Sequence, residues 1–73
     1  MYLRDLDPSL LLGLTVKSCI DEQLGLVTGI QEHWSLDGNY RIYTVVIKWL
    51  GGLEGHHSYF GETCTVVESS IPK

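Results

Sequence analysis

The segment YTVVIKWLGG at positions 43–52 limits the folds open to this chain more than any other. β-branched and aromatic residues favour strands, and successive side chains of a strand point to opposite faces. The predicted strand 41–50 has a first face of Tyr43, Val45, Ile47 and Trp49, while its second face includes Ile42 and Val46. We therefore expect the first face to form the core. The second face should be partly covered too, by the N-terminal residues or by a partner.

Four more strands are predicted around this one. Residues 14–18 alternate apolar and polar side chains, and residues 25–31 contain two glycines that indicate strong bending or a bulge. Asp37-Gly38-Asn39 predicts a turn within a loop at 34–40, and Gly51-Gly52 predicts a tight hairpin. The remaining strands fall within 53–60 and 63–68, after which a tail at 69–73 is expected to fray.

With 73 residues, the chain forms one domain. A flat sheet of five short strands would leave two exposed edges, and a strongly bent sheet that closes on itself removes most of that liability. We therefore predict an all-β, five-stranded, strongly bent small barrel over residues 14–68. Residues 1–13 precede it as an N-terminal arm, either a short helix begun by Asp7-Pro8 or an extended segment.

The pieces LTVKS, GLVTGI, TVVIKWLGG and HSYFGETCTVVE, which span residues 14–68, carry a resemblance. This series resembles small SH3-like barrels of the KOW and Tudor kind, and similar patterns occur in short phage proteins. The resemblance implies an SH3-like barrel and a phage origin, and no functional residue is carried over from it. The chain departs from the KOW pattern because it lacks basic loops.

Charge and apolar pattern restrict the partners. Five Lys and Arg against nine Asp and Glu give a net charge of −4, and the basic residues are scattered singly, which argues against nucleic acid. No segment approaches the ~20 apolar residues of a membrane span, and the acidic start does not fit a secretory signal. We expect an intracellular protein, cytoplasmic in a bacterial host if phage-encoded. Cys19 and Cys64 are then expected to be unpaired, with a disulfide as the alternative.

Aromatic residues near loops form the first candidate binding site. In Tudor-like barrels such rings can hold a methylated lysine or arginine by cation–π attraction. The alternative is that the rings cap the barrel ends or lie singly on the surface. The candidate residues are Trp34, Tyr40, Tyr59 and Phe60, with Glu32 or Asp37 as a nearby negative charge.

A second candidate is an apolar patch for a protein partner. The N-terminal arm is rich in leucine, and together with Ile42 and Val46 it exceeds what a minimal barrel needs inside. Such a patch would bind another protein or a second copy of the chain. The alternative is that the arm folds over Ile42 and Val46 within one molecule.

Metal and catalytic sites are not indicated. His56 and His57 are adjacent on a predicted strand and so point to opposite faces, and neither they nor His33 and Cys64 show a zinc-ligand spacing. No cofactor motif, nucleophile elbow or room for a small-molecule pocket is apparent. We predict a non-enzymatic protein-interaction module that binds a host or virion protein or itself. The alternatives are a KOW-like nucleic-acid-associated module and a structural subunit of a larger assembly.

Overall fold

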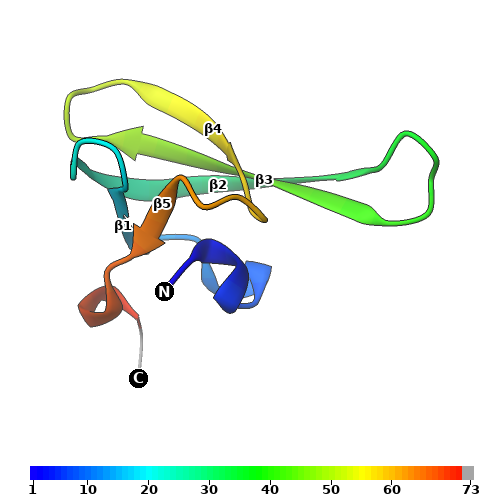
Figure 1. The fold of residues 1–73 in the computed structure, drawn as a ribbon, viewed down its shortest axis with the longest axis horizontal. Helices are drawn as coiled ribbons and strands as arrows, with labels where there is room; N and C mark the ends of the chain where they lie inside the picture. The colour runs from blue at the N-terminus through cyan, green and yellow to red at the C-terminus, as the bar shows by residue number, and fades with distance from the viewer. Residues whose placement is uncertain (72–73) are drawn as a thin grey trace.

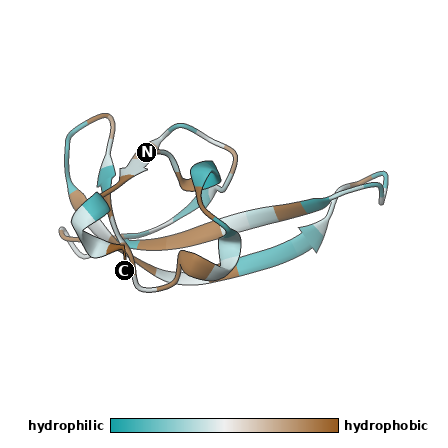
Figure 2. Cartoon of the chain, turned by 90° about the horizontal axis from the view of Figure 1, so that it is seen from below, coloured by the Kyte–Doolittle hydropathy of each residue, from teal (hydrophilic) through white to brown (hydrophobic). Residues whose placement is uncertain are grey.

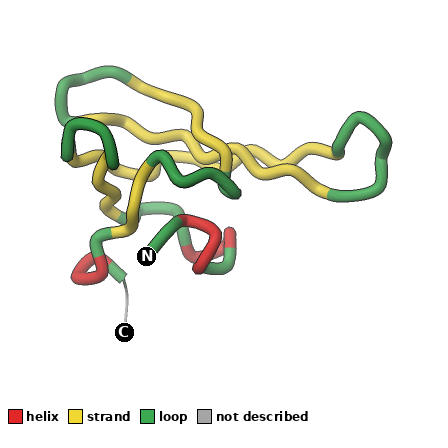
Figure 3. Tube along the Cα trace, in the orientation of Figure 1, coloured by secondary structure: helices red, strands yellow, loops and turns green. Residues whose placement is uncertain are grey.

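The computed structural model describes residues 1–71 and contains one antiparallel sheet (Figure 1). Its strands are β1 (Thr15–Ser18), β2 (Leu24–Trp34), β3 (Arg41–Trp49), β4 (Glu54–Ser58) and β5 (Cys64–Val66). Three single 3-10 turns flank the sheet (Figure 3): η1 (Leu3–Asp5), η2 (Pro8–Leu10) and η3 (Glu68–Ser70). The prediction of an all-β chain with five strands is confirmed.

The sheet is open. The strands are ordered β4-β3-β2-β1-β5, so that the last strand returns beside the first and β4 and β5 form the two edges. Figure 1 shows β5 running at a steep angle to the long β2–β3 hairpin. Within residues 1–71, no strand pairing joins β4 to β5, and the predicted closure into a barrel is therefore not observed.

A β-bulge at Thr28 interrupts the long hairpin. Val27 pairs with Ile47, and Gly29 pairs with Val46, the residue adjacent to Ile47 in β3. Thr28 therefore has no partner of its own. A bulge bends its strand and changes which side chains face inward. As a result, Val27 and Ile30 both pack in the core although three positions separate them. The glycine-marked irregularity predicted in this strand is confirmed.

The core lies on the inner face of β3. Val45 and Ile47 are fully buried, together with Val27 from β2 and Val16 from β1. Trp49 packs against the same cluster. Its ring lies directly against Gly25, where an added Cβ would come within 2.6 Å of the ring and 2.7 Å of Ile47. A side chain at position 25 would overpack the contact between β2 and β3.

The N-terminal arm covers this inner face. Leu3 and Leu11 are completely buried in the core cluster, and Leu6 packs against it. Of the two alternatives for the arm, the short helix begun by Asp7-Pro8 is the nearer one, since a single 3-10 turn, η2, starts there. Asp7 caps this turn by accepting a hydrogen bond from the Ser9 backbone N–H (2.9 Å). The alternative in which the arm folds over Ile42 and Val46 is contradicted, because Leu3 and Leu11 pack with Val45 and Ile47 on the opposite face of the sheet.

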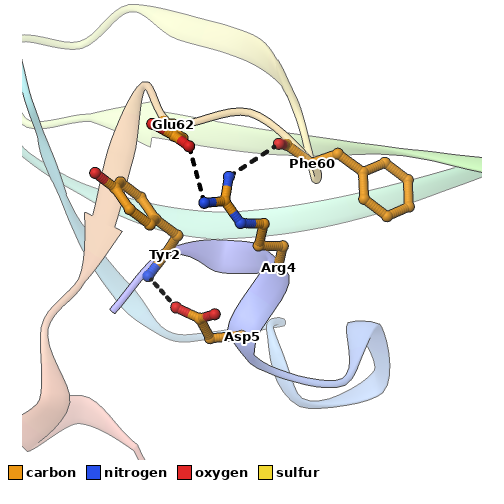
Figure 4. A network of polar contacts seen from close by, with 5 residues as sticks. All are labelled: Tyr2, Arg4, Asp5, Phe60 and Glu62. Carbon is orange, nitrogen blue, oxygen red and sulfur yellow. Dashed lines mark hydrogen bonds and ion pairs between the residues drawn. The ribbon is translucent and has the colours of Figure 1, made fainter.

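Polar contacts fasten the arm to the end of the chain. The Tyr59 hydroxyl donates to the Leu6 carbonyl, and the Val66 N–H donates to the Met1 carbonyl (2.7 Å). Figure 4 shows the Arg4 guanidinium between the Glu62 carboxylate (2.8 Å) and the Phe60 carbonyl. Because these contacts join residues more than fifty positions apart, the arm is an integral part of the fold.

The C-terminal segment is also anchored. In η3, the Ser70 hydroxyl donates to the Val67 carbonyl (2.6 Å) and accepts from the Thr15 N–H (3.1 Å), and Ile71 packs against the core. The expectation that the tail frays is therefore wrong for residues 69–71, and its last two residues lie outside the described part.

Adjacent leucines of the arm provide a test of its role. We expect Leu11→Ala to lower the free energy of unfolding by about 2–5 kcal/mol, because it leaves a cavity in the core. Leu12→Ala is the matched control, since Leu12 is 64% exposed and its loss should change stability by less than about 0.5 kcal/mol. Urea denaturation followed by circular dichroism measures both. Equal losses for the two variants would contradict this placement of the arm.

Candidate functional site

The outer half of the β2–β3 hairpin extends beyond the rest of the molecule (Figure 1). We call residues 31–43 the projecting hairpin. β1 pairs with β2 only as far as Leu26, and β4 pairs with β3 only from Thr44 onward, so the strands beyond these positions pair mainly with each other. Figure 2 shows apolar residues concentrated in the inner half of the two long strands and hydrophilic ones toward the projecting end. Tyr43 at its base packs against the core, and the rest of the projecting hairpin is largely exposed on both faces.

Side-chain hydrogen bonds order the turn at the tip. The Ser35 hydroxyl donates to the Asp37 carboxylate, which also accepts from the Asn39 N–H (3.0 Å). The Ser35 carbonyl accepts from the N–H of Gly38, which has a positive φ of 74°. The hydrogen bonds from Ser35 and Asn39 lower the pKa of Asp37, so its carboxylate stays ionised and keeps its partners. The tip is thus a defined turn.

This turn displays a group of large apolar side chains. Trp34 is 61% exposed, Tyr40 is 59% exposed, and Leu36 at the apex is fully exposed. Leu36, Tyr40 and the half-buried Ile42 line a shallow hollow of about 270 Å³ beside the turn. We call Trp34, Leu36 and Tyr40 the tip cluster. Exposed aromatic and leucine side chains on a protruding turn are the composition expected of a contact surface.

Ionic contacts stiffen the stem just behind the tip. Arg41 forms an ion pair with Glu32 from the neighbouring strand. Its guanidinium also lies over the Trp34 ring, 5.2 Å from the ring centroid. Cation–π contact at an exposed site stabilises by about 0.5–1 kcal/mol and orients the ring. Trp34 is therefore held in place by its own stem.

The structure separates the four aromatic residues of the predicted cage. Trp34 and Tyr40 lie on the projecting hairpin, whereas Tyr59 and Phe60 follow β4 beside the N-terminal arm. Tyr59 is only 7% exposed, contacts Tyr43 edge-on at 5.6 Å, and belongs to the core. Burial raises the pKa of Tyr59, as expected for a hydroxyl enclosed by the arm. Phe60 is half exposed and packs edge-on against Tyr59 at 4.9 Å.

The two β3 residues of the predicted apolar patch also differ. Ile42 is half-buried in the projecting hairpin and adjoins the tip cluster. Val46 is 7% exposed, with Gly29 and His56 as its cross-strand neighbours, and offers little surface to a partner. The residue that sequence reasoning missed is Leu36. Its signal was a bulky apolar side chain inside a polar turn, between Ser35 and Asp37.

The histidines and cysteines are dispersed. Within residues 1–71, no three His, Cys, Asp or Glu side chains come together as a metal site. Cys19 is exposed and Cys64 is buried, and both are free. Burial is the main cause of the raised pKa of the Cys64 thiol, which therefore stays protonated and unreactive.

His57 is part of the structure on the inner side of β4. Its ring lies edge-on to Trp49, with 5.5 Å between centroids, and its Nδ1 lies 3.4 Å from the Thr63 hydroxyl. Its Nε2 is buried without a hydrogen-bond partner among the described residues. Burial first, and the neighbouring His56 second, lower the pKa of His57. The folded structure therefore favours the neutral form of the His57 imidazole.

This arrangement predicts a pH dependence of stability. In the unfolded chain His57 titrates near its ordinary pKa of 6.5, while in the folded chain its pKa is lower. The unfolded state therefore binds a proton first, and the free energy of unfolding should fall as pH decreases below 6.5 until the folded-state pKa is passed. We expect His57→Phe to reduce this slope and His33→Gln, an exposed control, to keep it. Denaturation at pH 7.5 and 5 tests this, and an unchanged slope in His57→Phe would contradict it.

A scan against protein-family models finds no match to this chain, and searches of curated proteins and of solved structures find none either. The described residues include no helix that is long and apolar enough to cross a membrane.

Proposed function

We propose that this chain is a non-enzymatic protein-interaction module whose contact element is the projecting hairpin. The observation that carries the proposal is the exposure of the tip cluster: Trp34, Leu36 and Tyr40 all lie open at the end of the hairpin, on or beside a turn fixed by Ser35 and Asp37. Tryptophan and tyrosine are enriched among the few residues that carry most of the binding energy of protein interfaces, because a rigid ring buries much area at little cost in conformational entropy.

The arrangement of the strands supports an SH3-like fold as part of this proposal. A five-stranded SH3-like barrel has its last strand beside its first, which is the order found here. In this chain, Leu3 and Leu11 of the N-terminal arm cover the inner face that closure of the sheet would cover. The SH3-like resemblance concerns architecture, whereas the interaction role rests on the hairpin.

The charges favour a protein partner over nucleic acid. Arg4, Lys17 and Arg41 each form an ion pair with a glutamate, which leaves Lys48 as the one lysine or arginine in residues 1–71 outside an ion pair. Affinity for nucleic acid depends on several free cations that displace counterions from phosphates. The described surface offers no set of several unpaired cations, and a protein is therefore the better-supported partner.

The proposal is tested by removing the tip cluster while keeping the fold. We expect the double variant Trp34→Ser/Leu36→Ser to keep the circular dichroism spectrum and to lose its protein partner in cells that naturally produce the chain. The partner is identified by in-cell crosslinking with quantitative mass spectrometry, and its binding is then measured with purified proteins. We expect affinity to fall at least about tenfold, because loss of a hot-spot tryptophan such as Trp34 costs about 2 kcal/mol or more.

The matched control is Leu50→Ser/Leu53→Ser, in the turn between β3 and β4. These leucines are about as exposed as the tip cluster, at 82% and 77%, and lie at the opposite end of β3. The control variant should retain the partner at wild-type affinity. The proposal is overturned if the control loses the partner and the tip variant keeps it, or if both variants bind like wild type.

A further inference from the structure

A groove lies where the N-terminal arm meets the base of the projecting hairpin. It has a volume of about 540 Å³, which is within the range of about 300–1,000 Å³ typical of ligand sites. One wall comes from the arm, with Asp7, Pro8 and Leu12, and the other from the sheet, with Ile30, Glu32 and Tyr43. The two walls belong to segments that are distant in sequence, and the groove therefore exists only in the folded chain.

The lining of the groove has two kinds of chemistry. Pro8, Leu12, Ile30 and the Tyr43 ring provide apolar and aromatic surface, while Asp7 and Glu32 each contribute a carboxylate. Apolar walls beside carboxylates suit a side chain with an aliphatic stem and a positive end, because the stem packs while the charge stays at the rim. The aromatic ring adds favourable contact with a cation.

The two carboxylates differ in how far they are neutralised. Glu32 is already paired with Arg41. Asp7 takes part in no ion pair within the described residues, and it accepts hydrogen bonds from the backbone N–H (2.9 Å) and hydroxyl (2.8 Å) of Ser9. These hydrogen bonds lower the pKa of Asp7 and keep it ionised. The groove thus has an uncompensated negative charge, on a chain whose net charge is already −4.

We propose that this groove binds an arginine or lysine side chain from an extended segment of a partner protein, with the stem between Leu12 and Ile30 and the cation at Asp7. Charge complementarity selects this occupant, since an acidic ligand would meet Asp7 and Glu32, and a purely apolar one would leave Asp7 without a partner. The site adds a second contact to the proposed interaction module.

A short peptide tests the groove separately from the hairpin tip. The probe is the blocked tripeptide acetyl-Leu-Arg-Leu-amide, titrated at millimolar concentrations into the ¹⁵N-labelled full chain. Binding is followed by two-dimensional NMR. We expect the largest chemical-shift changes at the backbone amides of Ser9, Leu12, Ile30 and Tyr43, with the tip amides of Leu36 and Asn39 unaffected.

Two matched comparisons isolate the charge. The first replaces arginine in the peptide by citrulline, which has nearly the same shape and no charge. The second uses Asp7→Asn, whose amide oxygen can still cap η2. Each change should weaken binding about three- to fivefold, the size expected when one exposed ion pair is lost. Glu54→Gln removes an exposed carboxylate from β4 and should leave binding unchanged.

The proposal is overturned if arginine and citrulline peptides bind equally, if Asp7→Asn binds like wild type, or if the shifts appear elsewhere. Changes at the groove amides on dilution of the chain alone would assign the groove to a second copy and would also overturn it. Because the peptide does not engage the tip cluster, its failure to bind would leave the proposed role of the projecting hairpin standing. Conversely, loss of that role would not affect this titration.

Discussion

The burial of the inner face of β3 by the N-terminal leucines is the interaction on which the rest of this structure depends. Without the arm, Val45 and Ile47 would face water on this open sheet, and Leu3 and Leu11 cover them. The chain thereby builds a two-layered core without closing its strands into a cylinder. Hydrogen bonds from Tyr59 and Val66 to the arm fix this cover in place, so that the first and last parts of the sequence stabilise each other.

The same arrangement explains why a hairpin projects. The covering arm and the short strand β1 reach only the inner half of β2, which has 11 residues against 4 in β1. Beyond Ile30 the two long strands leave the core, and their order depends on local contacts: the Glu32–Arg41 ion pair, the guanidinium over Trp34, and the hydrogen-bonded turn. The groove forms at this transition, between the last covered turn of the arm and the first exposed residues of the hairpin.

The sequence predicted those features that depend on local alternation of apolar and polar residues. It did not predict features that depend on packing between segments distant in the sequence. The five strands, the buried face of β3 and the bulge followed from patterns within single segments. The choice between a short helix and an extended segment for the arm did not, because three successive leucines show no periodicity. β2 continues to Trp34, beyond the predicted end at residue 31, and the pattern missed this extension because Glu32 and His33 are both exposed and the alternation is lost there. In the sequence, Tyr59 and Trp34 are both aromatic residues beside predicted loops. In the fold, Tyr59 contacts the N-terminal arm and is buried, whereas Trp34 is exposed.

A small protein has a physical reason to keep its exposed hairpin ordered. An isolated two-stranded hairpin is marginally stable, and fixing each backbone residue costs about 1–2 kcal/mol. Here β2 and β3 continue from the core into the projecting residues, so the core supplies the nucleus and the register of the hairpin. The turn contacts of Asp37 then fix the tip before any partner arrives. Because the ordering cost is met during folding, association through Trp34, Leu36 and Tyr40 would retain most of the free energy gained by burying them.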